Sequence, residues 1–282
     1  GGPLDSAKDL YGHAFAMFGL AHYYRTFRRR EALEIARETS RLLKRHLRLP
    51  TGWFAAAAAQ DWTVADRSLK QNPHMHLLEA FVALTQASDE PAYKEDAVAL
   101  AELFHRRLFG DRTGTLGEFF DEAGRPHAET GRLVEPGHHF EWYWLLHEGA
   151  DLWRDVRAMP AAERLFAWAE RYGVDRELGG VFDLLDREGR VVKDTKRIWP
   201  QAERIKAYAL RARIALPSKE RENARRTLVS LLEFLFARYL LADGGWRESL
   251  DRTLIPRPTA LPATTPYHLF LALSEALTAL GA

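Results

Sequence analysis

A repeat of about 64 residues constrains the fold of this chain more than any other feature of its sequence. Helices that are apolar on most sides are predicted to begin near residues 9, 73, 137, 200 and 266, and they are expected to be buried. The first of them is rich in aromatic and small residues, with Tyr11, Phe15, Phe18 and Tyr23 among the residues expected to be buried. Each of the first four is followed by a helix that is charged on most sides and apolar along a narrow stripe. An alternation of buried inner helices and amphipathic outer helices is typical of helix hairpins arranged in a ring.

Nine helices are predicted, five inner and four outer. The inner helices are expected at 9–24, 73–87, 137–153, 200–216 and 266–280, and the outer helices at 28–47, 92–109, 161–172 and 219–241. A closed ring of six hairpins needs three more helices. We therefore expect residues 1–282 to form a single all-α domain, an (α/α)6 barrel or toroid of helix hairpins that lacks its N-terminal helices.

The connections that lead into the inner helices are long and follow one pattern. Residues 114–126 and 179–192 each place a short strand before an Asp-x-x-Gly or Asp-Arg-Glu-Gly turn, and residues 244–251 begin in the same way. These sequences predict short β-hairpins. We expect them at one mouth of the toroid, beside the starts of the inner helices.

Composition excludes several classes of function. A formal net charge of +1 gives no electrostatic reason to expect a nucleic acid or an anionic membrane as partner. The absence of cysteine excludes disulfides and thiolate metal sites, and it is compatible with a reducing compartment, so we expect a cytoplasmic protein. No apolar run approaches the roughly 20 residues that span a bilayer.

The segment 135–146 joins a Pro-Gly turn to two adjacent histidines at a helix start. Glu141 follows His138 by three residues and therefore shares its face, whereas His139 lies about 100° further round the helix. Imidazole titrates near neutrality, and an indole stacks on a pyranose ring, so this pattern suits an acid–base pocket for a sugar. We select His138 over His139 for that role.

Equivalent positions in the other repeats carry similar residue types. They are Asn72, His74 and His76, then Trp199 and Glu203, and finally His268. Because the starts of inner helices converge in a toroid, we expect these side chains to share one cavity. Helix N-termini also favour the negative charge of an enediolate intermediate.

Structural interpretations of single residues remain open at this stage. His74 is expected in the first helical turn, facing the rim. Core packing alone would explain His76, Trp199 and Trp246.

Two rival chemistries use the same residues. A zinc site could be built from the His-x-His sequence at 74–76 and the cluster that ends at Glu141. A glycoside hydrolase could use Glu141 and Glu203 as paired carboxylates. The second alternative leaves His138 and His268 without a role.

Five segments of the chain, in order, resemble the N-acylglucosamine 2-epimerase superfamily and, within it, the D-mannose isomerase-like branch. They are Lys8-Asp-Leu-Tyr-Gly-His-Ala-Phe15, Asn72-Pro-His-Met-His-Leu-Leu-Glu79, Glu135-Pro-Gly-His-His-Phe-Glu-Trp142, Arg197-Ile-Trp-Pro-Gln-Ala-Glu203 and Pro266-Tyr-His268. The resemblance implies an (α/α)6 barrel and aldose chemistry that needs neither metal nor cofactor. It places the paired general acid–base histidines on His138 and His268. The pocket residues that it implies are Tyr11, Asn72, His76, Glu141, Trp199, Glu203 and Trp246.

By this resemblance, one imidazole removes the C2 proton of an open-chain aldose to give a cis-enediolate. Return of the proton to C1 gives a ketose, and return to the opposite face of C2 gives an epimer. His268 is expected to be the C2 base, with His138 assisting ring opening or proton transfer between O1 and O2. The expected reaction is of the D-mannose to D-fructose type, and the alternative is a 2-epimerase of the N-acylglucosamine or cellobiose type.

The chain departs from the family pattern at its start. Relatives contribute a pocket arginine from N-terminal helices that this sequence lacks, so a non-catalytic sugar- or protein-binding role is a second alternative. We expect a monosaccharide substrate, and the sequence allows a homodimer without specifying one. Lys193, Lys196 and Arg197 are available for an anionic sugar but equally suit a solvated turn.

Overall fold

The computed structural model describes residues 6–214 and 217–281, and the chain divides into two compact units. Unit 1 comprises residues 1–110, 117–132 and 148–157, and unit 2 comprises residues 111–116, 133–147 and 158–282. All nine predicted helices are present in the described part of the chain. Their inner members begin within two residues of the predicted positions, at Leu10, Gln71, Pro136, Ile198 and Thr265. The predicted helix end at Leu216 lies outside the described residues.

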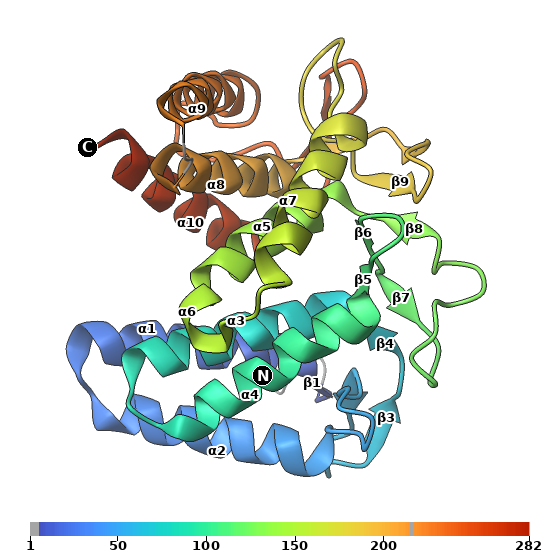
Figure 1. Ribbon diagram of the computed structural model, residues 1–282, viewed down its shortest axis with the longest axis vertical. Coiled ribbons are helices and arrows are strands. Elements are labelled where there is room, and N and C mark those ends of the chain that lie inside the picture. Colours follow the sequence, from blue (N-terminus) through green and yellow to red (C-terminus); the bar gives the residue numbers. More distant parts are fainter. Residues whose placement is uncertain (1–5, 215–216, 282) are drawn as a thin grey trace. The chain divides into compact units, whose positions relative to one another are not determined.

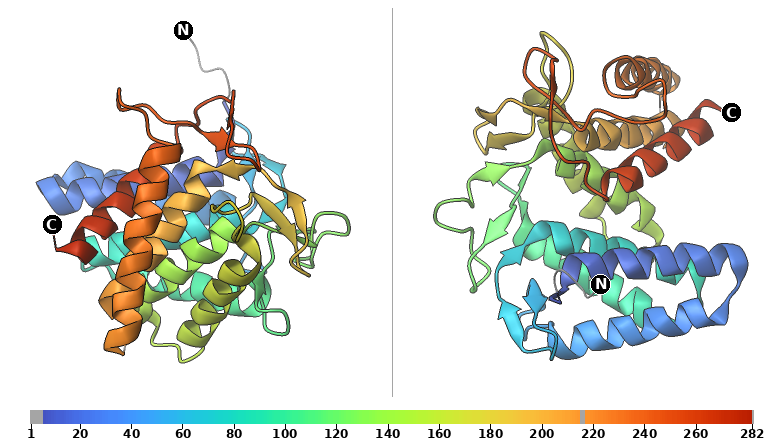
Figure 2. Two further views of the ribbon diagram at one scale, coloured as in Figure 1. Left: turned by 90° about the horizontal axis from the view of Figure 1, so that it is seen from above. Right: turned by 180° about the vertical axis from the view of Figure 1, so that it is seen from behind.

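Unit 1 is built from two helix hairpins (Figures 1 and 2). Its helices are α1 (Leu10–Phe27), α2 (Arg30–His46), α3 (Gln71–Ala87), α4 (Pro91–Leu103), the π-helical turn η1 (Phe104–Leu108) and the short α6 (Ala150–Trp153). Helix α1 packs against both α2 and α3, and α3 packs against α4. The inner helices α1 and α3 therefore lie next to each other, each covered by its outer partner.

The buried face of α1 differs from the prediction. Its four fully buried residues are Leu10, Ala14, Met17 and Ala21. The aromatic residues, which were expected to form the buried face, lie on the neighbouring side, and Tyr23 is 48% exposed. Alanine at every second buried position of α1 lets a neighbouring helix approach closely, whereas the larger aromatic rings of α1 pack beside this buried face.

Unit 2 contains the other three inner helices. Its helices are α5 (Pro136–Glu148), α7 (Ala158–Trp168), the π-helical turn η2 (Ala169–Gly173), α8 (Ile198–Ile214), α9 (Ser218–Arg238) and α10 (Thr265–Leu280). Helix α8 packs between α9 and α10 (Figure 1). Their shared core is apolar and includes Ile205, Leu228, Leu235 and Ala272, all at most 1% exposed.

Short strands lead directly into the inner helices. In unit 1 they are β1 (Lys8–Asp9), β2 (Ala57–Ala58), β3 (Val64–Asp66), β4 (Leu69–Lys70), β5 (Phe109–Gly110) and β7 (Phe119–Phe120). Unit 2 has β6 (Thr115–Leu116), β8 (Leu133–Val134), β9 (Leu184–Asp186), β10 (Val191–Lys193), β11 (Lys196–Arg197), β12 (Ser249–Leu250) and β13 (Pro256–Arg257). The antiparallel ladders are β1-β2-β3, β4-β7, β8-β9-β10 and β11-β12-β13. Since β1, β4 and β11 each end at the residue before a helix, pairing of the strand fixes where that helix starts.

The predicted hairpins are confirmed in shortened form. Strands β9 and β10 form the expected antiparallel pair. Phe120 of β7 bridges Pro126 across the turn at Gly124, whose positive φ of 72° favours glycine.

The helix predicted over 137–153 is interrupted at Gly149. Gly149 is the N-cap of α6, and a Cβ at this position would lie 1.8 Å from the ring of Trp153, so glycine leaves room for that ring beside the turn. In the described part of the chain, no helix is both long enough and apolar enough to cross a membrane.

Candidate active site

The start of α5 carries the two adjacent histidines of unit 2. Pro136 occupies the first helical position, where the missing N–H costs nothing, and residues 136–146 are all buried. A Cβ on Gly137 would lie 2.5 Å from the Trp199 ring, so glycine permits this close approach. His138 packs against the same indole, with ring centroids 4.9 Å apart.

Both ring nitrogens of His139 contact backbone groups, and its ring stacks on Trp168 with centroids 5.0 Å apart. Its Nδ1 lies 3.3 Å from the carbonyl oxygen of Glu135, and its Nε2 accepts a hydrogen bond from the Leu116 N–H at 3.2 Å. Complete burial lowers the pKa of His139 from 6.5 to about 3. A neutral ring with both nitrogens bound to backbone is a scaffold element, and the two adjacent histidines differ in surroundings as their helical positions predict.

The same helix position is used in the same way in α3 and α8. His74 donates through Nδ1 to the carbonyl of Lys70 at 2.7 Å, and its Nε2 accepts from the Phe54 N–H at 2.8 Å. Gln201 accepts from the Val181 N–H at 2.7 Å and donates back to the Val181 carbonyl at 3.0 Å. Each fourth residue therefore fastens an incoming connection to a helix start.

The prediction that His74 faces the rim is wrong. Its side chain is 2% exposed and packs edge-on against Trp53, with centroids 5.0 Å apart. The buried Phe54 N–H needs an acceptor, and the imidazole supplies it from inside the unit.

The fourth residue of α10 has a different partner. His268 Nδ1 lies 2.6 Å from Oε1 of Glu203, and both side chains are buried. The second carboxylate oxygen of Glu203 lies 2.7 Å from Nζ of Lys206, one turn further along α8. A carboxylate on Nδ1 fixes the tautomer in which Nε2 carries the lone pair, which is the form that a general base needs.

Glu141 and Tyr267 extend this cluster. Glu141 Oε1 is 4.0 Å from His268 Nδ1 and 3.5 Å from the Tyr267 hydroxyl, which donates to it. The Trp199 ring lies beside His268, with centroids 5.3 Å apart, as it does beside His138. Unit 2 thus brings together two carboxylates and two imidazoles around one indole.

Trp246 is fixed at the edge of the same unit. Its indole N–H donates to Oε2 of Glu248 at 3.0 Å, and the Thr265 hydroxyl donates to the same oxygen at 2.8 Å. Because Thr265 is the first residue of α10, Glu248 connects Trp246 to the helix that carries His268.

The remaining predicted site residues lie together in unit 1. The His76 ring packs edge-on against Tyr11 at 5.2 Å, and its Nδ1 lies 3.1 Å from Oε2 of Glu79. Asn72, one turn before His76 on α3, has a buried Oδ1 with no hydrogen-bond partner in the described part of the chain. A sugar hydroxyl is a suitable donor for such an acceptor.

A metal ion is the rival occupant of the unit 2 cluster. One ligand atom from each of Glu141, Glu203 and His268 lies within 4.8 Å of the other two. The Lys206 ammonium, 2.7 Å from Glu203, would however stand beside a dication and repel it. The Glu203 carboxylate is therefore better matched to the Lys206 ammonium and the His268 imidazole beside it than to a metal ion.

Three members of the cluster were not predicted from the sequence: Lys206, Tyr267 and Glu248. Lys206 follows Glu203 at a spacing of three, which places both on one face of α8, and this spacing was an available signal. Tyr267 adjoins His268, and Glu248 lies in the connection to α10, where no periodic pattern marks it.

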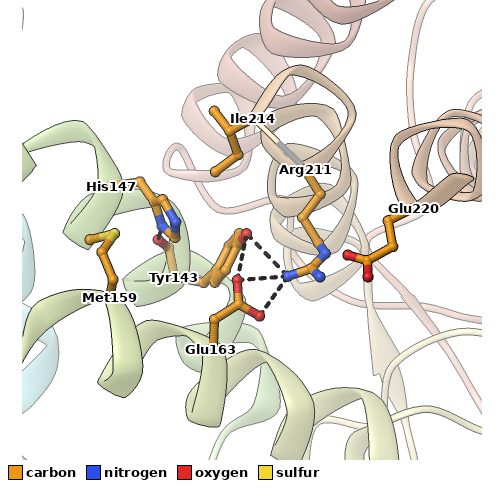
Figure 3. Close-up of a pocket in the computed structure, with 7 residues that line it drawn as sticks. All are labelled: Tyr143, His147, Met159, Glu163, Arg211, Ile214 and Glu220. Atoms are coloured by element: carbon orange, nitrogen blue, oxygen red, sulfur yellow. Dashed lines mark hydrogen bonds and ion pairs between the residues drawn. The ribbon is translucent and has the colours of Figure 1, made fainter. Parts of the chain in front are cut away.

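A separate pocket of about 390 Å³ lies toward the C-terminal ends of α5 and α8 (Figure 3). Arg211 lines this pocket. Its Nη1 lies 2.7 Å from Glu163 and also donates to the Tyr143 hydroxyl at 3.2 Å. Burial raises the pKa of Tyr143, and burial lowers that of His147. Arg211 and Glu163 neutralise each other, and none of the predicted site residues lines this pocket.

The structure defines a class of protein that is built from repeated helix hairpins and carries carboxylates and imidazoles near the starts of inner helices. The model of the N-acylglucosamine 2-epimerase (GlcNAc 2-epimerase) family matches residues 1–272. The chain belongs to this family of sugar isomerases and epimerases.

Relatives of both reaction types are similar to the chain. A mannose-6-phosphate isomerase from Rhizobium meliloti (strain 1021) is 34% identical over 281 residues, covering 96% of the chain and 70% of the relative. A cellobiose 2-epimerase from Dictyoglomus turgidum is 26% identical over 293 residues, covering 95% and 70%. The crystal structure of a D-mannose isomerase superposes with a TM-score of 0.86 at 24% identity, over 98% of this chain and 73% of that one. The last comparison shows a shared fold.

Proposed function

We propose that the protein is an aldose–ketose isomerase that converts D-mannose to D-fructose through a cis-enediolate. One observation carries the proposal: a buried carboxylate binds Nδ1 of His268 and leaves Nε2 as the basic nitrogen. Family membership supplies the sugar chemistry, and the predicted pocket residues agree with it.

In this reaction His268 Nε2 removes the C2 proton of the open-chain aldose, and the electron pair forms the C1–C2 double bond as O1 gains a proton. Delivery of the proton from Nε2 to C1 then re-forms a carbonyl at C2 as O2 loses its proton. His138, which packs against the Trp199 ring as His268 does, would move the proton between O2 and O1. Glu141 would hold a substrate hydroxyl, and the indoles of Trp199 and Trp246 would form apolar walls for the sugar.

Tyr11, Asn72 and His76 of unit 1 are proposed to be substrate-binding residues as well. The unpartnered Oδ1 of Asn72 supports this role, because it is a buried acceptor on a predicted pocket residue. We further propose that the fold is an (α/α)6 barrel and that the protein is located in the cytoplasm.

A neutral hexose is favoured over a hexose phosphate. Lys196 is fully buried, with Nζ 2.7 Å from Asp175. Arg197 lies 3.1 Å from Asp183 and 2.7 Å from Glu135. Lys196 and Arg197, two of the three cations expected from the sequence for an anionic sugar, are thus neutralised by carboxylates. The third, Lys193, is exposed and lies 3.9 Å from Asp183.

The test is proton NMR of the protein with D-mannose in D2O containing EDTA. Fructose carrying deuterium at C1 would support the isomerase. Glucose carrying deuterium at C2, with little fructose, would replace it by the 2-epimerase, for which the cellobiose 2-epimerase relatives provide the precedent. Parallel runs with mannose 6-phosphate and cellobiose identify the sugar, and absence of exchange with all three would contradict an enzymatic role and favour a binding protein.

A further inference from the structure

Lys206 is a buried cation with no role in the chemistry described above. The side chains of Lys206 and Glu203 are both 0% exposed, and their charged atoms lie 2.7 Å apart. Burying an ammonium ion costs several kcal/mol unless a partner compensates, and a leucine at this position would pack at lower cost. A buried lysine beside a proposed catalytic pair therefore calls for an explanation.

The charged form of Lys206 is supported on two sides. Besides Glu203, its Nζ lies 4.4 Å from the centroid of the Trp144 ring and 5.7 Å from that of Tyr267. Both are cation–π distances, which favour the ammonium form in a desolvated site. Glu203 is thus shared between the ammonium of Lys206 and the imidazole of His268.

The charge on Glu203 decides how strongly His268 is driven to become a cation. Burial raises the pKa of Glu203, but the charge of Lys206 and the hydrogen bond from His268 together outweigh it and lower that pKa below its ordinary value. An ionised carboxylate with no other partner would stabilise imidazolium, whose two N–H groups leave no base. A carboxylate already balanced by an ammonium does so much less.

Other titratable groups of unit 2 face the same imidazole. On α5, Glu141 lies 4.0 Å from Nδ1, and His138 packs against the same Trp199 ring as His268. On α10 itself, Tyr267 adjoins the ring at 4.8 Å. Glu248 is engaged at the start of α10 through Thr265. Within this set, Lys206 is the positive charge that contacts Glu203.

We propose that Lys206 is a positioning residue that neutralises Glu203, so that Glu203 orients His268 without holding it protonated. Lys206 touches no substrate atom in this scheme. It limits the negative charge that Glu203 presents to Nδ1 of His268. The inference rests on the proposed function, in which His268 is the C2 base.

Lys196 provides a matched control. It is also 0% exposed and also lies 2.7 Å from one carboxylate, that of Asp175. Its ammonium further donates to the carbonyls of Gly179 and Arg252, at 2.8 and 3.2 Å. Removal of Lys196 therefore measures the loss of a buried ion pair away from His268.

The experiment is an NMR titration of the histidine ring signals in the wild type, Lys206→Met and Lys196→Met, with His268→Gln identifying the signal of His268. A unit charge within about 4–6 Å shifts a titration by about 1–3 pH units. We expect the His268–Glu203 pair to take up its proton about one pH unit or more higher in Lys206→Met, and at the wild-type pH in Lys196→Met. The acid limb of the pH–rate profile should move upward with it.

Further variants keep the test decisive. Lys206→Arg should restore the wild-type midpoint. If Lys206→Met does not fold, Glu203→Gln replaces it and should move the midpoint downward, because the anion is gone and the cation remains. An unchanged midpoint in folded Lys206→Met or Glu203→Gln, or an equal shift in Lys196→Met, would overturn the inference. Because the titration needs no turnover, an upward shift without activity on any sugar would refute the proposed function and leave the electrostatic role of Lys206 standing.

Discussion

The start of α5 and the start of α10 both place a histidine at the fourth position of an inner helix, and the two residues have different partners. His139 bonds to backbone groups on both sides of its ring. His268 bonds to the carboxylate of Glu203. Position in the repeat therefore determines where a side chain lies, but the partner determines whether it can transfer protons.

Gln201, at the equivalent position of α8, shows that an amide can replace the scaffold imidazole. Its side chain accepts from the Val181 N–H and donates to the Arg197 carbonyl at 2.8 Å. Glutamine is thus the natural substitution with which to compare the two histidines.

The largest expected effect is on activity. His268→Gln removes the proposed base and should lower kcat/KM for D-mannose by about 10²- to 10⁴-fold, which is the usual contribution of a general base. His139→Gln should retain a rate close to that of the wild type, because its role is confined to backbone bonds. Equal losses of kcat/KM in the two variants, measured by fructose formation, would contradict the distinction between a catalytic His268 and a structural His139.

The next effect concerns stability. His139→Ala deletes a buried ring and leaves the Leu116 N–H unsatisfied, so it should lower the free energy of unfolding by about 2–4 kcal/mol. His13, at the same position of α1, also bonds to the carbonyl before its helix, at 2.6 Å, but in an exposed setting. His13→Ala should cost at most about 0.5 kcal/mol in urea unfolding. A large loss there would mean that the bond itself, and not its burial, carries the energy.

The smallest effect sharpens the comparison through pH. The pKa of His139 is lowered from 6.5 to about 3, so the unfolded chain binds a proton below pH 6.5 that the native ring does not. The stability associated with the neutral ring is present above pH 6.5 and is lost as pH falls toward 3. By pH 5 the loss is about 2 kcal/mol. His139→Gln should lose about that much less stability than the wild type between pH 7 and pH 5, and parallel unfolding curves would contradict this.

Much of the fold could be predicted because the inner helices repeat at a nearly constant interval and strands mark their starts. The choice of His138 over His139 followed from helical geometry alone. The buried face of α1 could not be predicted. An aromatic residue such as Tyr23 in an apolar helix is expected to be buried, whereas the fully buried positions of α1 alternate alanine with Leu10 and Met17. The burial of His74 depended on an orphan N–H at Phe54, twenty residues away in sequence.

Lys206 shows why the rest of the site escaped prediction. In sequence, a lysine between apolar residues of a helix resembles any solvated charge. Its burial depends on Glu203 and on rings from two other helices, those of Trp144 and Tyr267. Local sequence records the spacing of three from Glu203, but it carries no record of the two rings.

The position of Trp199 has a consequence for spectroscopy. Its indole touches the rings of both His138 and His268, and Gly137 leaves the room for it. A protonated imidazole quenches the emission of an indole that it contacts. The protein therefore contains an intrinsic fluorophore in contact with both candidate proton-transfer groups, and a change in the charge of either ring should alter the contribution of Trp199 to the emission of the eight tryptophans.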